Sequence, residues 1–371
     1  MPKIRVALLL LASLLFSLIA YPVSSGALNA SSTFSISGTI INQESTPLVG
    51  GWGGARLSET VRYTEEAINS PRASPQSVVF NGEVASNAEM EMLYMKNHGW
   101  NAVRAYWEAP YRQQSAEWGY NSTWLNRMIT IAEALGMYII VDCHGYYDAS
   151  ENFSLWMSTW AGIISQFKNS YSGIIWEPLN EPLEPGLAGA SAVSALQTQY
   201  QAWIDQARNL GDTHWIIVSG IEFGNSQPDM VNWFPAVNDQ INRVFYNWHY
   251  YFYFDDESSD WTIAAAQAKA DAYFNAITQL IAKYNRPFLC TEMGAQSHTG
   301  SAPPPDLQYD KASGYSTVSL AFVQRLVTDF DNCAGGRIGY MLWTGETGQR
   351  TGISVGITEA YTEAWMFGEP F

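Results

Sequence analysis

Residues 137–144 read MYIIVDCH and residues 173–179 read GIIWEPL, two short and almost entirely apolar runs. Neither alternates apolar and polar residues, so both are typical of strands buried on the two faces of a parallel sheet. Six further runs of the same character are found at 47–51, 101–106, 214–219, 243–250, 287–292 and 338–343. The sequence therefore predicts eight buried parallel strands.

Segments with helical spacing of apolar residues separate these strands. In residues 124–135 the apolar positions include Leu125, Met128 and Ile129, and Gly136 follows as a typical residue just past a helix end. Residues 86–98, 191–209, 263–284 and 317–330 behave similarly. Eight strands alternating with helices predict an α/β fold, a single (β/α)8 TIM barrel rather than an open doubly wound sheet. Residues 31–47 predict a small N-terminal hairpin.

The first residues have the layout of a secretory signal. Lys3 and Arg5 precede an unbroken apolar or small run over 6–20, and small residues occupy 24–27. We expect residues 1–27 to be a signal peptide and residues 28–371 to form the single mature domain of a secreted, extracellular protein. An uncleaved membrane anchor is the alternative, although the apolar run is short for a membrane span.

Composition points away from polyanionic partners. The formal charge is −16, from 35 acidic and 19 basic residues, which argues against nucleic acid or an anionic membrane surface as the partner. Charged residues make up only 15% of the chain, and aromatic residues reach 14%, including 15 Trp. Neutral sugars stack on aromatic rings, so this composition favours carbohydrate binding. We expect a monomer that binds a polysaccharide and needs no cofactor.

The cysteines are expected to be buried thiols rather than a disulfide framework. Cys143 precedes His144 by one position, so it should point outward from the barrel if His144 points inward. Cys290 lies two residues before Glu292 and should share its inward direction. The two thiols would then lie in different layers.

Polar residues gather where the predicted strands end, which is where (β/α)8 barrels place their active sites. A carboxylate in such a position is costly unless it has partners or a chemical task. The candidate site residues are Arg104, His144, Asn180, Glu181, His249, Tyr251, Glu292 and Trp343.

The stretch IIWEPLNEP at 174–182 resembles the strand-4 signature of glycoside hydrolase family 5, the cellulase family within the barrel clan of retaining β-glycosidases. Glu177 matches a recurrent family acid, whereas Pro178 replaces the usual aliphatic residue and Gly145 stands where many members have a second histidine. Further segments resemble strands 2, 3, 6, 7 and 8 of the family in the same order: NAVR at 101–104, IVDCH at 140–144, HYY at 249–251, TE at 291–292 and LW at 342–343.

The resemblance implies a role for each candidate. Glu181 would be the general acid/base and Glu292 the nucleophile of a double displacement. Arg104 and Tyr251 would orient Glu292 and lower its pKa, and Asn180 would bind the sugar 2-hydroxyl. The remaining candidates would contact hydroxyl and carboxyl groups or stack on the sugar ring: His144, His249 and Trp343.

We expect an endo-acting β-1,4-glucanase, with β-mannanase as the alternative in the same family. A metal-dependent sugar isomerase and a non-catalytic glycan-binding protein are the alternatives of other classes, but no His-x-x-x-His or Cys-x-x-Cys spacing supports a metal site. His98 and His214 are interpreted as structural. Four tryptophans are possible sugar platforms, with most of them expected in the core or at the rim: Trp52, Trp107, Trp118 and Trp156.

Overall fold

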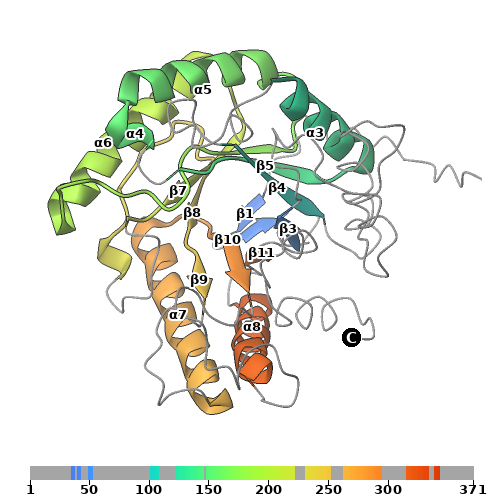
Figure 1. Cartoon of the computed structure of the whole chain (residues 1–371), viewed down its shortest axis with the longest axis vertical. Helices are drawn as coiled ribbons and strands as arrows, with labels where there is room; N and C mark the ends of the chain where they lie inside the picture. Colours follow the sequence, from blue (N-terminus) through green and yellow to red (C-terminus); the bar gives the residue numbers. More distant parts are fainter. Residues whose placement is uncertain are drawn as a thin grey trace, which may run out of the picture.

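A sheet of parallel strands forms the centre of the computed structural model, which describes residues 35–37, 40–42, 49–52, 101–107, 122–145, 148–221, 230–251, 262–294, 315–333 and 338–342 (Figure 1). The strand order is β8-β7-β6-β5-β4-β3-β11-β10-β9, and all neighbours pair in parallel. The bounds are β3 Val49–Trp52, β4 Ala102–Trp107, β5 Tyr138–Cys143, β6 Ile174–Glu177, β7 Trp215–Ser219, β8 Val244–Asn247, β9 Tyr250–Tyr251, β10 Leu289–Gly294 and β11 Gly339–Leu342. These strands coincide with the eight predicted runs, since β8 and β9 divide one of them.

The sheet closes on itself between β8 and β10. Tyr246 in β8 forms a parallel bridge with Phe288, and its backbone N–H donates to the carbonyl of Pro287 at 2.9 Å. β9 then pairs with β10 further along, with Tyr250 opposite Met293. β8 and β9 are therefore two halves of one barrel strand that is interrupted at residues 248–249.

Helices lie around the outside of the sheet (Figure 1). They are α3 Ser122–Leu135, α4 Asp148–Glu151, α5 Phe153–Phe167, α6 Gly189–Asn209, α7 Ile263–Tyr284 and α8 Tyr315–Asp331, with a short 3-10 turn η3 Met230–Asn232. Four of them match predicted helices, and the predicted helix at 86–98 lies outside the described residues. Gly136 ends α3 with φ 63°, the left-handed conformation that suits glycine after a helix.

Helix α5 was not predicted, although its spacing carries the signal. Trp156, Trp160 and Ile163 recur at helical intervals along one face and are fully buried. Asn152 caps the helix by accepting a hydrogen bond from the backbone N–H of Leu155 at 3.3 Å. The hypothesis that Trp156 is a sugar platform is wrong, because its ring is in the core and its Nε1 donates to the carbonyl of Pro178.

The core has two layers, as a closed barrel requires. Alternate strand residues fill the barrel interior: Ala102, Tyr138, Ile140, Ile175, Trp215, Ile217, Phe245, Leu289 and Met341. The intervening residues pack outward against the helices, where they form the larger of the two clusters. This alternation decides which side chains reach the inside of the barrel.

None of the three cysteines, all of which the structure describes, forms a disulfide. Cys143 packs in the outer layer as predicted. The prediction that Cys290 points inward is wrong, because its Sγ lies 3.3 Å from the Trp248 carbonyl and 3.9 Å from Tyr273 Oη of α7. The pairing register between β10 and β11 shifts between Cys290 and Met293, so strict alternation does not hold there.

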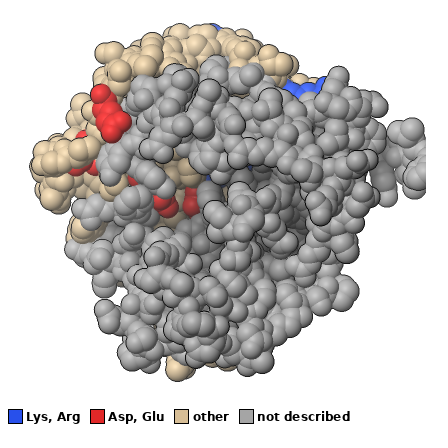
Figure 2. Space-filling view, viewed as in Figure 1, with Lys and Arg blue, Asp and Glu red and all other residues tan. Residues whose placement is uncertain are grey.

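At the N-terminal side, β1 Ser35–Ser37 and β2 Ile40–Asn42 pair antiparallel as a separate two-stranded sheet. The predicted signal peptide at 1–27 lies outside the described residues. None of the described helices is long and apolar enough to cross a membrane. Where the described surface is visible in Figure 2, acidic side chains cover more of it than basic ones, in keeping with the formal charge of −16.

Candidate active site

A layer of polar side chains covers the apolar barrel interior near the carboxyl ends of the strands. Its members continue the inward-facing alternation of their strands, and each comes from a different strand: Arg104, Asp142, Glu177, Ser219, Asn247 and Thr291. All six are 4% exposed or less. Polar groups buried this deeply are stable only with mutual hydrogen bonds, and the layer supplies them.

Arg104 is the centre of this layer. Its Nε donates to Glu177 Oε2 at 2.6 Å and its Nη1 to Glu292 Oε1 at 2.5 Å. Its Nη2 donates to Asn180 Oδ1 at 2.8 Å and lies 2.9 Å from Asp142 Oδ2. Burial lowers the pKa of Arg104, but the three carboxylates raise it well above its ordinary value. The positively charged guanidinium of Arg104 thus orients the carboxylate of Glu292.

Glu181 follows β6 in a left-handed backbone conformation with φ 41°. Non-glycine residues rarely adopt this region, and such conformations cost about 1–3 kcal/mol. The preceding residue, Asn180, anchors the segment by donating its backbone N–H to the carbonyl of Cys143 at 3.0 Å. Burial, followed by the charge of Glu292, raises the pKa of Glu181 well above its ordinary value. This shift favours the protonated form of Glu181.

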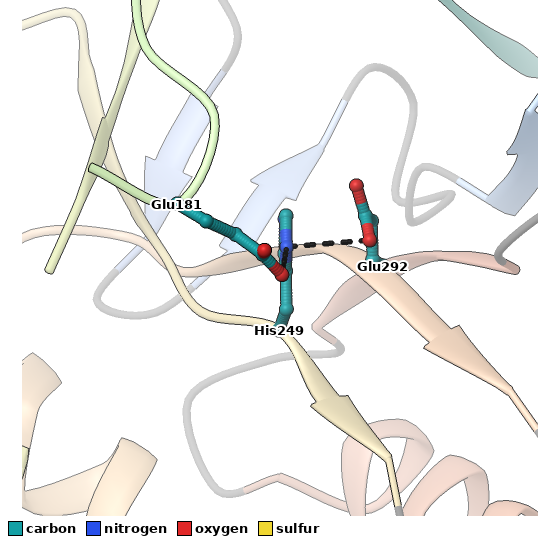
Figure 3. A group of neighbouring side chains, drawn as sticks. All are labelled: Glu181, His249 and Glu292. Atoms are coloured by element: carbon teal, nitrogen blue, oxygen red, sulfur yellow. Dashed lines mark hydrogen bonds and ion pairs between the residues drawn. The ribbon is translucent and has the colours of Figure 1, made fainter. Parts of the chain in front are cut away.

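His249 contacts both glutamates (Figure 3). Its Nδ1 lies 2.7 Å from Glu181 Oε1 and 3.4 Å from Glu292 Oε2. One oxygen of each carboxylate and one ring nitrogen of His249 all lie within 4.8 Å of one another. Burial, with a further contribution from the positive charge of Arg104, lowers the pKa of His249 well below its ordinary value, so the imidazole is neutral.

His249 lies at the interruption between β8 and β9 and continues the inward-facing alternation of Phe245 and Asn247. Trp248 packs outward against Phe234 and Tyr273, with ring centroids 6.1 and 5.4 Å away. Tyr273 Oη also donates to the Trp248 carbonyl at 2.9 Å. Helix α7 thus fixes the backbone from which the His249 side chain reaches the glutamates.

The shifted register of β10 turns the side chain of Glu292 into the barrel. Cys290 faces the helices, so strict alternation would turn residue 292 outward as well. Instead Thr291 and Glu292 both point into the barrel, where Thr291 Oγ1 contacts Glu177 at 3.0 Å and Glu292 contacts Arg104. The irregularity in the strand therefore brings the second glutamate into the site.

The structure brings six of the eight predicted residues together: Arg104, His144, Asn180, Glu181, His249 and Glu292. His144 is joined to the others through Asp142, whose Oδ2 lies 2.8 Å from His144 Nδ1. Tyr251 lies in β9 and its side chain is outside the described part, as is the whole of Trp343. Those two assignments remain predictions.

Four residues of the network were missed from the sequence: Asp142, Ser219, Asn247 and Thr291. Asp142 lies two positions before His144 and Asn247 two before His249, so alternation along each strand could have identified both. Thr291 follows the inward-facing Leu289 by two positions, but the expected inward direction of Glu292 predicted the opposite direction for its neighbour Thr291.

Among the described residues, Glu181, His249 and Glu292 are a group whose donor atoms could together contact a metal ion. A cation there would lie next to the Arg104 guanidinium, which is 2.5 Å from Glu292. It would also have to displace the proton that Glu181 retains. The charges of this set suit proton transfer between protein groups better than metal binding.

Comparison with known proteins agrees with this geometry. Residues 64–348 match the family model described as cellulase, glycosyl hydrolase family 5. No curated protein sequence matches the chain.

Several solved structures share the fold. A broad-specificity endoglucanase from an uncultured bacterium is 18% identical, with 86% of this chain and 94% of that chain covered and a TM-score of 0.59. A family 5 enzyme from Prevotella bryantii is 16% identical over 86% of this chain and 96% of that chain, with a TM-score of 0.58. A lichenase from a Caldicellulosiruptor species, solved with cellotetraose, is 16% identical over 87% of this chain and 93% of that chain, with a TM-score of 0.56.

These likenesses confirm the predicted (β/α)8 barrel, and the family match extends over most of the chain, including every described residue of the polar layer. The protein is therefore a member of glycosyl hydrolase family 5, with glycoside hydrolase activity as its expected chemistry.

Proposed function

We propose that this protein is a secreted, retaining endo-β-1,4-glucanase. The observation that carries the proposal is the short separation of its two glutamates, whose nearest oxygens lie within 4.8 Å of each other. Retaining glycosidases place their carboxyl groups about 5–5.5 Å apart, whereas inverting enzymes need about 6.5–9.5 Å to admit a water molecule between them. The separation in this site favours direct attack by one of the glutamates.

The proposed reaction has two steps. Glu181 donates its proton to the glycosidic oxygen while a carboxylate oxygen of Glu292 attacks the anomeric carbon, and the leaving chain departs as an alcohol. Glu181, now a carboxylate, then takes a proton from water, and the resulting hydroxyl displaces Glu292 from the sugar. The retained proton on Glu181 and the Arg104 bond to Glu292 support this assignment of roles.

Asn180 supports a sugar ligand. Its Oδ1 accepts from Arg104, but its buried Nδ2 has no hydrogen-bond partner within the described part of the chain. A buried donor without an acceptor costs about 1–3 kcal/mol, so such a group usually has a ligand as its partner. We propose that it donates to the 2-hydroxyl of the sugar next to Glu181, a contact that strengthens in the transition state.

The substrate class rests on related structures. Those described above include an endoglucanase and a lichenase with cellotetraose, and a further family 5 structure from Prevotella bryantii contains a xyloglucan oligosaccharide. All of these point to a β-1,4-linked glucan backbone.

The proposal of secretion rests on the basic start and apolar run of residues 1–27. N-terminal sequencing of protein from culture fluid should find a mature start between residues 25 and 31.

The proposal is tested by substrate and stereochemistry together. Purified protein is given carboxymethylcellulose, mixed-linkage β-glucan, xylan and mannan, with the Glu292→Ala variant as the inactive control. We expect a rapid fall in viscosity on the two glucans, and NMR should detect the β-anomer as the first product. Cleavage of mannan alone would instead identify a β-mannanase, and initial release of the α-anomer would refute the retaining mechanism.

A further inference from the structure

A chain of hydrogen bonds behind His249 determines which of its nitrogens carries the proton. The chain begins at Asn247, whose Oδ1 accepts from the backbone N–H of Thr291 at 2.9 Å. A backbone N–H is always a donor, so this contact fixes the orientation of the amide. The Nδ2 group of Asn247 must therefore face the opposite way, toward Ser219 Oγ at 3.0 Å and Glu177 Oε1 at 3.3 Å.

Glu177 takes part in this chain as an acceptor. Arg104 Nε donates to its Oε2 at 2.6 Å, and Asn247 Nδ2 approaches its Oε1. Burial raises the pKa of Glu177 to about 7, while the hydrogen bonds from Arg104 and Thr291 lower it. In the ionised state, Glu177 can only accept, so the single hydroxyl proton of Thr291 goes to Glu177 Oε1 at 3.0 Å.

Thr291 Oγ1 then has only acceptor capacity left for His249 Nε2, which lies 2.8 Å away. Nε2 also lies 3.2 Å from Asn247 Nδ2, but its shorter contact, with Thr291 Oγ1, needs a hydrogen that Thr291 cannot supply. Nε2 must therefore carry the imidazole proton. A neutral imidazole has one N–H, so Nδ1 is a bare acceptor that faces Glu181 Oε1 at 2.7 Å.

We infer that Thr291 is a positioning residue: by accepting the Nε2 proton of His249, it leaves Nδ1 free to accept the proton that Glu181 holds for the leaving oxygen. This role rests on the proposed function of Glu181 as general acid. The burial that makes His249 neutral, and that raises the pKa of Glu181, agrees with it.

Charged and titratable groups surround His249 from several strands: Arg104 in β4, Asp142 and His144 at β5, Glu177 and Glu181 at β6, and Glu292 in β10. The charges of these groups influence whether the imidazole of His249 is protonated, but they do not decide which of its two nitrogens carries the proton of the neutral ring. That selection depends on the direction of the hydrogen bonds, which is why a hydroxyl without charge can control it.

Loss of the hydroxyl should reverse the tautomer. In Thr291→Val, the remaining polar neighbour of Nε2 within the described part of the chain is the Asn247 amide, a donor, so the proton should move to Nδ1. Nδ1–H would then donate to Glu181 and stabilise the carboxylate, which lowers the pKa of Glu181. The general acid would lose its proton at a lower pH than in the wild type.

The experiment compares Thr291→Val, Thr291→Ser and the matched control Thr278→Val, whose partly exposed hydroxyl donates to the carbonyl of Asn275 in its own helix. The first readout is the pH dependence of kcat/KM on β-glucan and on 2,4-dinitrophenyl β-cellobioside. The second is the ¹⁵N chemical shift of the His249 ring nitrogens at about pH 8, above the pKa of about 7 of Glu177, which distinguishes the two tautomers without requiring activity.

In Thr291→Val we expect the basic limb of the pH profile of kcat/KM on β-glucan to move down by on the order of one pH unit. At pH values above this limb, kcat/KM should fall roughly tenfold relative to the wild type. The dinitrophenyl substrate, which needs no proton on its leaving group, should show little change in kcat/KM. Thr291→Ser should restore the wild-type limb, and the proton should lie on Nε2 in the wild type and on Nδ1 in Thr291→Val.

A folded Thr291→Val protein with an unmoved limb, or a wild-type protein with its proton on Nδ1, would overturn the role of Thr291. If Thr291→Val does not fold, the serine variant and the wild-type ¹⁵N shifts still decide it. A wild-type protein that cleaves no β-glycan would instead refute the proposed function, while the tautomer measurement would still test the hydrogen-bond chain.

Discussion

At the scale of single residues, replacement of each glutamate by alanine should affect hydrolysis of β-glucan and of an activated glycoside differently. Glu181→Ala should lower hydrolysis of β-glucan by about 10²–10⁴-fold, because the leaving oxygen lacks its acid. A dinitrophenyl glycoside should still form the covalent intermediate and show a burst, because only the second step then lacks a base. Glu292→Ala should be inactive on both substrates. Equal behaviour of the two variants on both substrates would contradict the assignment of roles.

Glu181 also has a predicted effect on stability, whose sign follows from its raised pKa. Between about pH 4.3 and the folded-state pKa, the folded protein binds more protons at this site than the unfolded chain. The site therefore destabilises the fold progressively as pH rises through this window. Glu181→Gln, which cannot ionise, should be more stable than the wild type at pH 7 and similar to it near pH 4. Urea unfolding at both pH values measures this, and a difference independent of pH would contradict it.

At the scale of elements, α7 supports the site from outside the barrel. It lies next to α8 (Figure 1), and its Tyr273 holds the Trp248 carbonyl beside the strand interruption. Thr262 caps this helix by accepting from the backbone N–H of Ala265 at 3.1 Å. Thr262→Ala should lower the free energy of unfolding by about 1 kcal/mol. Thr278→Ala, in the exposed middle of the same helix, is the control and should not destabilise, since alanine is the better helix former. Equal losses in the two variants would show that the cap is unimportant.

At the scale of the whole molecule, the charge balance predicts tolerance of acid. Full protonation of the carboxylates leaves only 19 Lys and Arg plus 5 His with positive charge over 371 residues. Repulsion among so few charges is modest, and such repulsion normally drives acid unfolding. We expect the protein to keep its circular dichroism and its activity after incubation near pH 4. A pH–activity profile that peaks above neutrality, with rapid loss near pH 4, would contradict this prediction.

The sequence alone determined the barrel and the positions of its two glutamates. Short unalternating apolar runs that alternate with helical segments favour strands buried on both faces, and the carboxyl ends of parallel strands meet at one end of a barrel. Arg104, Asn180, Glu181 and Glu292 were predicted on this basis together with the family motif, and the structure brings them into contact.

Only the tertiary structure decided how these residues are connected. The inward direction of Glu292 depends on a register shift against β11, and the backbone beside His249 is fixed by Tyr273 of α7. Thr291 acquires its role from hydrogen bonds to residues 42 and 114 positions away in the chain. The pattern of apolar residues along one strand predicts which face of a regular strand is buried. Pairing irregularities and long-range hydrogen bonds arise only when strands distant in sequence are packed together, because only then does each polar group acquire its partner.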